Sequence, residues 1–457
     1  MYLGNSRMFL GKTTNDVVYG EWKAVAPTEA TNGEYGVTGT TDYEVYCLEW
    51  VSSFNTLMVG GKFENIISGS EVILANSIAR FDGDWKALTA ANISASVTGA
   101  TSGVRGGSLS QDLGVVRVIR DVPMGSGVPT SKFIIVAGDF SRAGIIYHPT
   151  SSTQDPPQTA QLELNIALYG LGSPGVTGWF NPGTISSPLR VNSEIYNISG
   201  VRYTNSLRTY SKVLICGDFT DVYISSISDF SPYLCTIYHN ATTNVYGYGK
   251  IQSGIDGLIS FNNALGPMLV YYGGSGNLSN DNPYYTIDDR GNVYELTYAS
   301  PGNYDATEVQ ELSTILNSLP GAFLTRNVTE FTEEDSSLTR YLSTDPILVS
   351  YNENDYQVLN PNLVGNSVDT VFYNSGYHLV VGNISNQKPS TFYNLESGNE
   401  KPIRFPTNAT GTKINAVVVD DNTGTVYVGG KFVFQDSDGN TAWNVAKFVP
   451  DASKLPT

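Results

Sequence analysis

A short glycine-containing word occurs near both ends of this chain, and it restricts the possible folds more than any other feature of the sequence. Leu-Met-Val-Gly-Gly-Lys-Phe at 57–63 recurs as Val-Tyr-Val-Gly-Gly-Lys-Phe at 426–432. Weaker versions of the word stand at 135–140, 214–219, 269–274 and 379–384. Because self-similar segments at a recurring period indicate a repeat architecture, we expect one supersecondary unit to recur along the chain.

Other elements accompany the glycine word and define the repeating unit. A segment that begins with asparagine follows the word at 76–81, 165–169 and 444–448. Apolar segments precede it at 45–48, 115–118, 368–371 and 414–418. In the first copy, Asp-Trp-Lys-Ala-Leu at 84–88 comes directly after an Asp-Gly pair, which is a strong hairpin signal. The unit is therefore predicted to be four short antiparallel strands, with a period of roughly 50 to 80 residues.

Four-stranded units repeated in this way form the blades of a β-propeller. A glycine inside a strand lets another backbone approach closely, and the phenylalanine after it fills space between blades. We therefore predict an all-β fold in which residues 1–457 form a single closed β-propeller domain. Six glycine words give six blades, but strand-like sequence at 347–351 and 355–359 favours seven, with six as the alternative. The segment 306–319 is predicted to be a short helix.

The two ends of the chain predict how the ring closes. The last copy supplies three strands and then stops without a Trp-Lys-Ala strand. Gly-Glu-Trp-Lys-Ala-Val at 20–25 matches Gly-Asp-Trp-Lys-Ala-Leu at 83–88. We predict that residues 20–26 pair with residues 444–450, so that an N-terminal strand closes the last blade and removes an exposed edge.

The Val-Gly-Gly-x-Phe word, followed by Asn-x-Ile/Val-Ala-x-Phe and Asp-x-Trp, resembles the propeller repeats of the Rax2-type cortical polarity marker ectodomains of fungi. It is also similar to Gly-Gly-x-Phe propeller repeats in bacterial surface proteins. The resemblance covers most of the chain, with its best matches in the first and last copies, and it implies a non-catalytic propeller. The chain departs from the family because it shows neither a secretory signal nor an apolar segment of the roughly 20 residues that span a membrane.

Composition limits the partners and the chemistry. A net charge of −17, from 43 acidic and 26 basic residues, argues against a nucleic-acid partner, because phosphate binding needs clustered lysine and arginine. The three histidines, His148, His239 and His378, do not pair at metal-ligand spacing, and no nucleophile elbow, phosphate loop or zinc-protease motif occurs. We therefore predict no catalytic residues, no cofactor and no metal.

Two features leave alternatives open. Asp-Ser-Asp-Gly-Asn at 436–440 resembles part of a calcium loop but lacks the closing glutamate, so a turn is favoured over calcium bound by Asp436 and Asp438. Cys47, Cys216 and Cys235 lie in apolar strand-like sequence and are expected to be buried free thiols. A bridge between the last two is a minor alternative.

Long connections predict where the protein binds its partners. Loops from strand two to strand three, and from strand four to the next blade, emerge on one face of a propeller. The inserts at 89–112, 141–163 and 298–340 fall there, and they are rich in the small polar residues common in binding loops. Tyr147 and Tyr304 are the predicted aromatic binding residues of this long-loop face.

These features favour binding over catalysis. Three features suggest a virion structural component, such as a tail, spike or capsid-associated propeller. They are the low fraction of charged residues (15%), a composition rich in Tyr, Asn, Thr and Gly, and the degenerate repeats. Its predicted partners are other structural proteins, or a surface receptor or glycan, within a larger symmetric assembly and without membrane insertion. The family resemblance offers an extracellular or cell-surface adhesion module as the alternative. A glycan-active enzyme is a further alternative that no motif supports.

Overall fold

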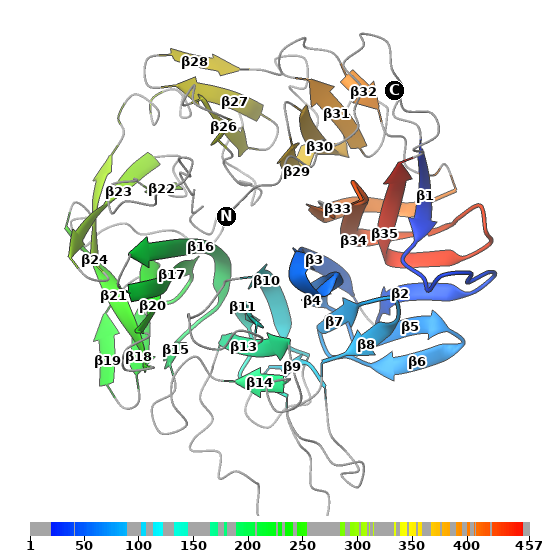
Figure 1. Ribbon diagram of the computed structural model, residues 1–457, viewed down its shortest axis with the longest axis horizontal. Helices are drawn as coiled ribbons and strands as arrows, with labels where there is room; N and C mark the ends of the chain where they lie inside the picture. Colours follow the sequence, from blue (N-terminus) through cyan, green and yellow to red (C-terminus); the bar gives the residue numbers. More distant parts are fainter. Residues whose placement is uncertain are drawn as a thin grey trace, which may run out of the picture.

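In the computed structural model the chain folds into β-sheets, which confirms the predicted all-β class (Figure 1). The structure describes residues 20–40, 42–88, 102–106, 113–121, 132–144, 165–171, 178–180, 189–205, 208–224, 227–230, 234–240, 245–253, 284–287, 293–300, 303–308, 310, 314, 333–334, 339–344, 347–352, 355–358, 367–374, 377–383, 390–394, 400–402, 406, 408–420 and 423–450. Within these ranges there is no helix of the length and hydropathy that a membrane span requires.

One four-stranded plan, in which each strand is antiparallel to the next, recurs along the chain. The first sheet contains β3 (Glu44–Val51), β4 (Thr56–Lys62), β7 (Ile78–Phe81) and β8 (Trp85–Ala87). The second contains β10 (Val115–Asp121), β11 (Lys132–Asp139), β13 (Ile166–Leu171) and β14 (Gly178–Phe180). The third contains β16 (Ile195–Asn205), β17 (Arg208–Gly217), β20 (Leu234–Asn240) and β21 (Val245–Ser253).

The remaining sheets follow in chain order. A three-stranded sheet, joined to β21 by a parallel pairing with β24, contains β22 (Tyr284–Ile287), β23 (Val293–Ser300) and β24 (Asn303–Glu308). The next contains β25 (Glu333–Glu334), β26 (Thr339–Thr344), β27 (Ile347–Asn352) and β28 (Asp355–Val358). It is followed by β29 (Ser367–Asn374), β30 (Tyr377–Asn383), β31 (Ser390–Asn394) and β32 (Glu400–Pro402). The last contains β33 (Thr410–Val419), β34 (Val426–Gln435), β35 (Thr441–Pro450) and β1 (Gly20–Ala24).

The sheets stand around a common centre, with β33, β3, β10 and β16 nearest to it (Figure 1). Contacts between neighbouring sheets run through these inner strands, from β29 to β33, β3, β10 and β16. The helix predicted for 306–319 is corrected at its start, because residues up to Glu308 belong to β24. Gln310 and Thr314, farther along that segment, have helical backbone. The alternation of Tyr304 and Ala306 with polar neighbours suits a strand, and this pattern outweighed helix propensity.

Strand β1 completes the last sheet, as the matching ends of the sequence predicted. It pairs antiparallel with β35, from Gly20 opposite Pro450 to Ala24 opposite Ala446. The same aromatic contact recurs in three of the sheets, between a tryptophan on the fourth strand and the aromatic ring directly opposite it on the third strand. The pairs are Trp22 with Phe448, Trp85 with Phe81, and Trp179 with Tyr169. The repeat at Trp179 is too degenerate to be found in the sequence alone.

The two glycines of the repeated word make room for different neighbours. A Cβ on Gly61 or on Gly430 would lie 2.1 or 2.0 Å from a carbonyl oxygen of the adjacent first strand, β3 or β33. Both first strands carry a bulge at this point. A Cβ on Gly429 would instead lie 2.5 Å from Cγ1 of Val45, which belongs to the next sheet. The word is therefore a packing device, and its glycines are dictated by strand and sheet contacts.

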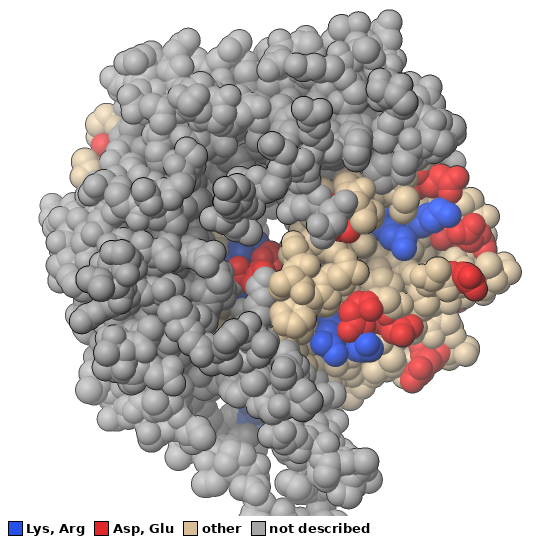
Figure 2. Space-filling model, in the orientation of Figure 1, with Lys and Arg blue, Asp and Glu red and all other residues tan. Residues whose placement is uncertain are grey.

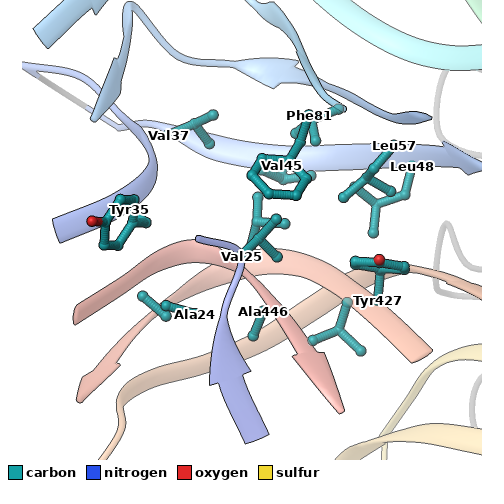
Figure 3. Close-up of a cluster of buried hydrophobic side chains, with 14 of the residues drawn as sticks. Ala24, Val25, Tyr35, Val37, Val45, Leu48, Leu57, Phe81, Tyr427 and Ala446 are labelled. Atoms are coloured by element: carbon teal, nitrogen blue, oxygen red, sulfur yellow. The ribbon is translucent and has the colours of Figure 1, made fainter. Parts of the chain in front are cut away.

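The largest buried cluster joins the last sheet to the first. Side chains from β1, β2 (Glu34–Thr38), β3, β4, β34 and β35 converge between the sheets (Figure 3). Tyr427 stacks on Trp50 across this boundary, with ring centroids 5.3 Å apart. Offset aromatic pairs add about 0.5–1.5 kcal/mol to the burial of their area. The last and first sheets are therefore joined by a packed core as well as by strand pairing.

The three cysteines are buried free thiols, as predicted. Cys216 and Cys235 lie on the paired strands β17 and β20, but Cys235 is opposite Ile215, the neighbour of Cys216. Because neighbouring residues of a strand point to opposite faces, the two thiols cannot meet, and the bridge alternative is wrong. Burial raises the pKa of Cys47 to about 12, so this thiol stays protonated.

Candidate functional site

Short strands in the connections between the main strands pair with one another to form ribbons. In the first, β2 pairs with β5 (Asn65–Gly69), which pairs with β6 (Glu71–Leu74). In the second, β9 (Val104–Arg105) pairs with β12 (Arg142–Ala143). In the third, β15 (Leu189–Val191) pairs with β18 (Asp221–Ile224), which pairs with β19 (Ile227–Phe230).

Each ribbon joins the same two connections of a sheet. One strand of the ribbon precedes the first strand of the sheet, and the other follows its second strand. Both connections leave an antiparallel sheet at the same end, so the ribbons extend one face, which we call the ribbon face. Two predicted inserts meet here, because β9 lies within 89–112 and β12 within 141–163. Only 102–106 and 141–144 of these two inserts are among the described residues.

A buried asparagine fastens each of two ribbons to its neighbouring sheet. Asn444 accepts a hydrogen bond at Oδ1 from the backbone N–H of Phe432 at 3.0 Å, and its Nδ2 donates to the carbonyl of Val37 on β2 at 2.7 Å. Asn165 makes the equivalent bonds to its own glycine word at 3.0 Å and to β15 at 3.2 Å. Both have left-handed backbone, with φ of 61° and 53°, which asparagine adopts at lower cost than most residues. The asparagine of the sequence repeat is therefore a brace between sheet and ribbon.

Of the two tyrosines predicted to bind a partner, only Tyr304 is among the described residues. Tyr147 lies outside the described residues. Tyr304 lies within strand β24, opposite Tyr298 of β23 and Ile251 of β21, so it is not a loop residue. The insert predicted at 298–340 is likewise corrected, because β24, β25 and the start of β26 fall inside it. A tyrosine in an alternating pattern is a strand residue, and this signal was present in the sequence.

The loop at 436–440 is a turn that holds the N-terminal strand, in agreement with the favoured interpretation. The Asp436 carboxylate accepts backbone N–H groups of Ala24 at 3.0 Å, Asp438 at 2.9 Å and Asn440 at 2.8 Å. Asp438 forms an ion pair with Lys23 of β1 at 3.0 Å. Through these contacts the two carboxylates fasten β1 to the last sheet.

The histidines show no constellation in the described part of the chain. His239 lies in β20 and His378 in β30, on different sheets, whereas His148 is outside the described residues. In the ranges given above, no three His, Cys, Asp or Glu side chains gather as a metal site would require.

Charged side chains of the inner strands link neighbouring sheets. The Arg117 Nε of β10 lies 2.5 Å from Oε1 of Glu194, at the start of the third sheet, and its guanidinium stands 4.5 Å from the ring centre of Tyr46 on β3. On the other side of β3, Lys413 and Asn415 of β33 each reach Oε1 of Glu44 at 2.6 Å. Figure 2 shows acidic and basic atoms at the opening in the middle of the molecule.

A second set of inner contacts runs parallel to the first. Arg120 Nη1 lies 3.6 Å from Glu49 Oε2 on one side and its Nε donates to the Ile198 carbonyl at 3.1 Å on the other. The backbone N–H of Asp121 also donates to Glu49, at 2.7 Å. These groups therefore pair with one another by hydrogen bonds and ion pairs between sheets. We call the set the inner belt; it consists of Glu44, Glu49, Arg117, Arg120, Glu194, Lys413 and Asn415. The belt was not predicted from the sequence. Its signal was the charge at the polar positions of otherwise apolar first strands.

Comparison with known proteins yields a likeness in structure alone. No family model and no curated protein matches the chain. Among solved structures, that of Saccharomyces cerevisiae Sqt1, a WD40 propeller protein, matches with 10% sequence identity and a TM-score of 0.46. The match covers 94% of this chain and 100% of that chain.

Proposed function

We propose that the chain is a closed seven-bladed β-propeller that acts as a non-catalytic binding and assembly protein, as a structural component of a virion. The pairing of β1 with β35 and the placement of the sheets around one centre support a closed ring. The count of seven takes β16–β21 and β22–β24 as two blades, although β21 and β24 join them into one sheet, and adds the sheets that contain β3, β10, β26, β29 and β33. Averaged electron micrographs of the purified protein test the count, and six radial densities would contradict it.

The observation that carries the binding role is the recurrence of ribbons on one face. Function commonly resides in connections that a rigid scaffold positions, and here the braces by Asn165 and Asn444 hold those connections in place. The ribbon face also exposes apolar side chains, with Val72 64% and Leu74 46% exposed. Exposed apolar groups on an ordered surface favour a protein interface.

The virion setting rests on the composition of the chain, and the partners there would be other structural proteins or a surface receptor or glycan. Antibodies against the protein should detect it in purified particles, whereas detection on cell surfaces alone would favour the adhesion alternative. Shortening the inserts at 89–112 and 141–163, with β9 and β12 retained because Val104 is buried in the core, should leave the fold intact and abolish incorporation or attachment. Normal assembly of the shortened protein would show that the working face lies elsewhere.

Catalysis is tested separately. The purified protein should leave a panel of polysaccharides intact at neutral pH, measured by reducing-end release and by the ultraviolet absorbance of unsaturated lyase products. Turnover of any member would contradict the non-catalytic assignment and restore the glycan-active alternative.

A further inference from the structure

Strand β6 has an exposed apolar surface and, among the described residues, a free edge. In the described part of the chain β6 pairs only with β5. The ribbon of β2, β5 and β6 continues the last sheet, because β2 pairs in parallel with β35, and β6 is the final strand of that combined sheet. Val72 and Leu74 alternate with Ile73, which packs against the buried cluster between the first and last sheets. The two exposed residues therefore share the outer surface of the ribbon, away from that cluster.

The backbone of such a strand is a template for another strand. An unpaired edge presents N–H and C=O groups in a row, and proteins usually protect it with lysine, proline, a bulge or a very short strand. The edge strand β8 has such protection, because it is three residues long and its central Lys86 is exposed. Strand β6, with sequence Glu-Val-Ile-Leu, is also short at four residues, but it has no lysine or proline and two of its apolar side chains are exposed.

The charges around β6 define what would pair with it. Glu71 begins the strand, and Glu34 of β2 lies at the same end of the ribbon, opposite Gly69. Glu64 precedes β5 at the other end, beside the pairing of Asn65 with Leu74. No lysine or arginine occurs in β2, β5 or β6. An apolar strand with carboxylates at both ends is complementary to an apolar segment with a basic residue at each end.

We propose that β6 accepts, as an added β-strand, an extended segment of another protein that has alternating apolar residues and a basic residue at each end. Main-chain hydrogen bonds to β6 supply the affinity, and the contacts with Val72 and Leu74 supply the specificity. Four residues of strand span about 10 Å, so a segment of five to seven residues covers the edge and reaches both acidic ends. The proposal rests on the binding role of the ribbon face and names its partner.

The probe is a fluorescein-labelled peptide, Lys-Val-Thr-Val-Thr-Val-Lys, whose binding to the full chain is followed by fluorescence anisotropy. We expect saturable binding that weakens at least tenfold when Val72 and Leu74 are both replaced by threonine. Glu71→Lys should weaken it several-fold and reduce its salt dependence, because screened charge pairs contribute to it. Glu21→Lys, the same charge change at an exposed residue of β1, is the matched control and should leave the affinity unchanged.

Two further peptides separate strand addition from simple adhesion. A peptide with glutamate at both ends should bind at least tenfold more weakly, and so should one with N-methyl groups on alternate amides, which lacks edge donors. Equal binding of the N-methylated peptide, or an unchanged affinity in the threonine variant, would overturn the proposal. The thermal unfolding of every variant should match that of the wild type, because the altered side chains are exposed.

Sedimentation velocity tests whether β6 pairs with a second copy of this chain instead of another protein. If the wild type is a dimer that the threonine variant dissociates, and the peptide does not bind, β6 pairs with a second copy and the proposal is wrong. Particle incorporation distinguishes this proposal from the one on which it rests. Insert shortening that abolishes incorporation, while the threonine variant incorporates normally, would retain the ribbon face and reject β6 as its contact.

Discussion

Replacing Asn444 is the sharpest test of how the ribbons are held. Its side chain is buried, accepts the N–H of Phe432 and donates to the carbonyl of Val37. Alanine at this position removes both bonds and must also adopt a φ of 61°. Glycine removes the same two bonds but adopts that backbone without steric cost. The pair of variants therefore separates hydrogen bonding from backbone strain.

The expected magnitude follows from the groups left behind. A buried donor or acceptor without a partner costs about 1–3 kcal/mol, so loss of both bonds should lower the free energy of unfolding by about 2–6 kcal/mol. The left-handed backbone costs alanine roughly 1–2 kcal/mol more than glycine. Asn444→Ala should therefore be the less stable of the two variants, and both should be well below the wild type.

Urea unfolding, followed by tryptophan fluorescence, measures these differences as shifts in midpoint at constant slope. Asn55 provides the matched control, because it is exposed and has a φ of 49°. Asn55→Ala should lose only the backbone contribution of roughly 1–2 kcal/mol. If Asn444→Gly were as stable as the wild type, the brace would contribute nothing and the reasoning would be refuted.

Three further results are expected. Removal of residues 1–26 should lower the temperature of unfolding sharply, because β35 loses its partner strand, and an unchanged calorimetric scan would contradict the closure. Gly430→Ala should cost about 1–3 kcal/mol through overpacking in urea unfolding, because the new Cβ would lie 2.0 Å from the Lys413 carbonyl oxygen. Gly39→Ala, whose new Cβ would lie 3.2 Å from the nearest atom, Cβ of Tyr43, should cost less. Burial raises the pKa of Tyr427 from 10.0 to about 12 and of Cys47 from 9.0 to about 12, so the unfolded chain ionises first and stability should fall as the pH rises from 9 towards 12. Tyr427→Phe should remove part of that alkaline loss, and equal pH dependence in the two proteins would exclude a contribution from Tyr427.

The sequence predicted the parts of the fold that short-range pattern determines. The glycine word, the asparagine segment and the tryptophan strand each became one strand of a recurring sheet, and the match of 20–25 to 83–88 located the pairing of β1. These elements were readable because a glycine pressed against a carbonyl, as at Gly61 and Gly430, leaves no alternative residue. The prediction of a loop at Tyr304 is wrong because the long polar stretch around it hides an alternating pattern, which forms strand β24.

The candidate site was less predictable, because its parts depend on contacts between distant segments. Nothing local in Val104-Arg105 indicates that it pairs with Arg142-Ala143, and a two-residue strand has no periodicity. The brace by Asn165 was visible as a repeated residue, but its partner at Val191 follows only from the placement of the next sheet. The inner belt likewise needs three neighbouring sheets before Arg117 and Glu194 meet.

The pairing of β1 with β35 imposes an order on folding in the cell. Strand β1 is synthesised before every other described strand, yet its partner follows more than 400 residues later. At translation rates of about 5–20 residues per second, β1 waits roughly 20 to 90 s for β35 to leave the ribosome. During that interval the indole of Trp22 lacks the Phe448 ring that covers it in the finished sheet. The nascent chain therefore carries β1 without its partner strand until the end of its synthesis.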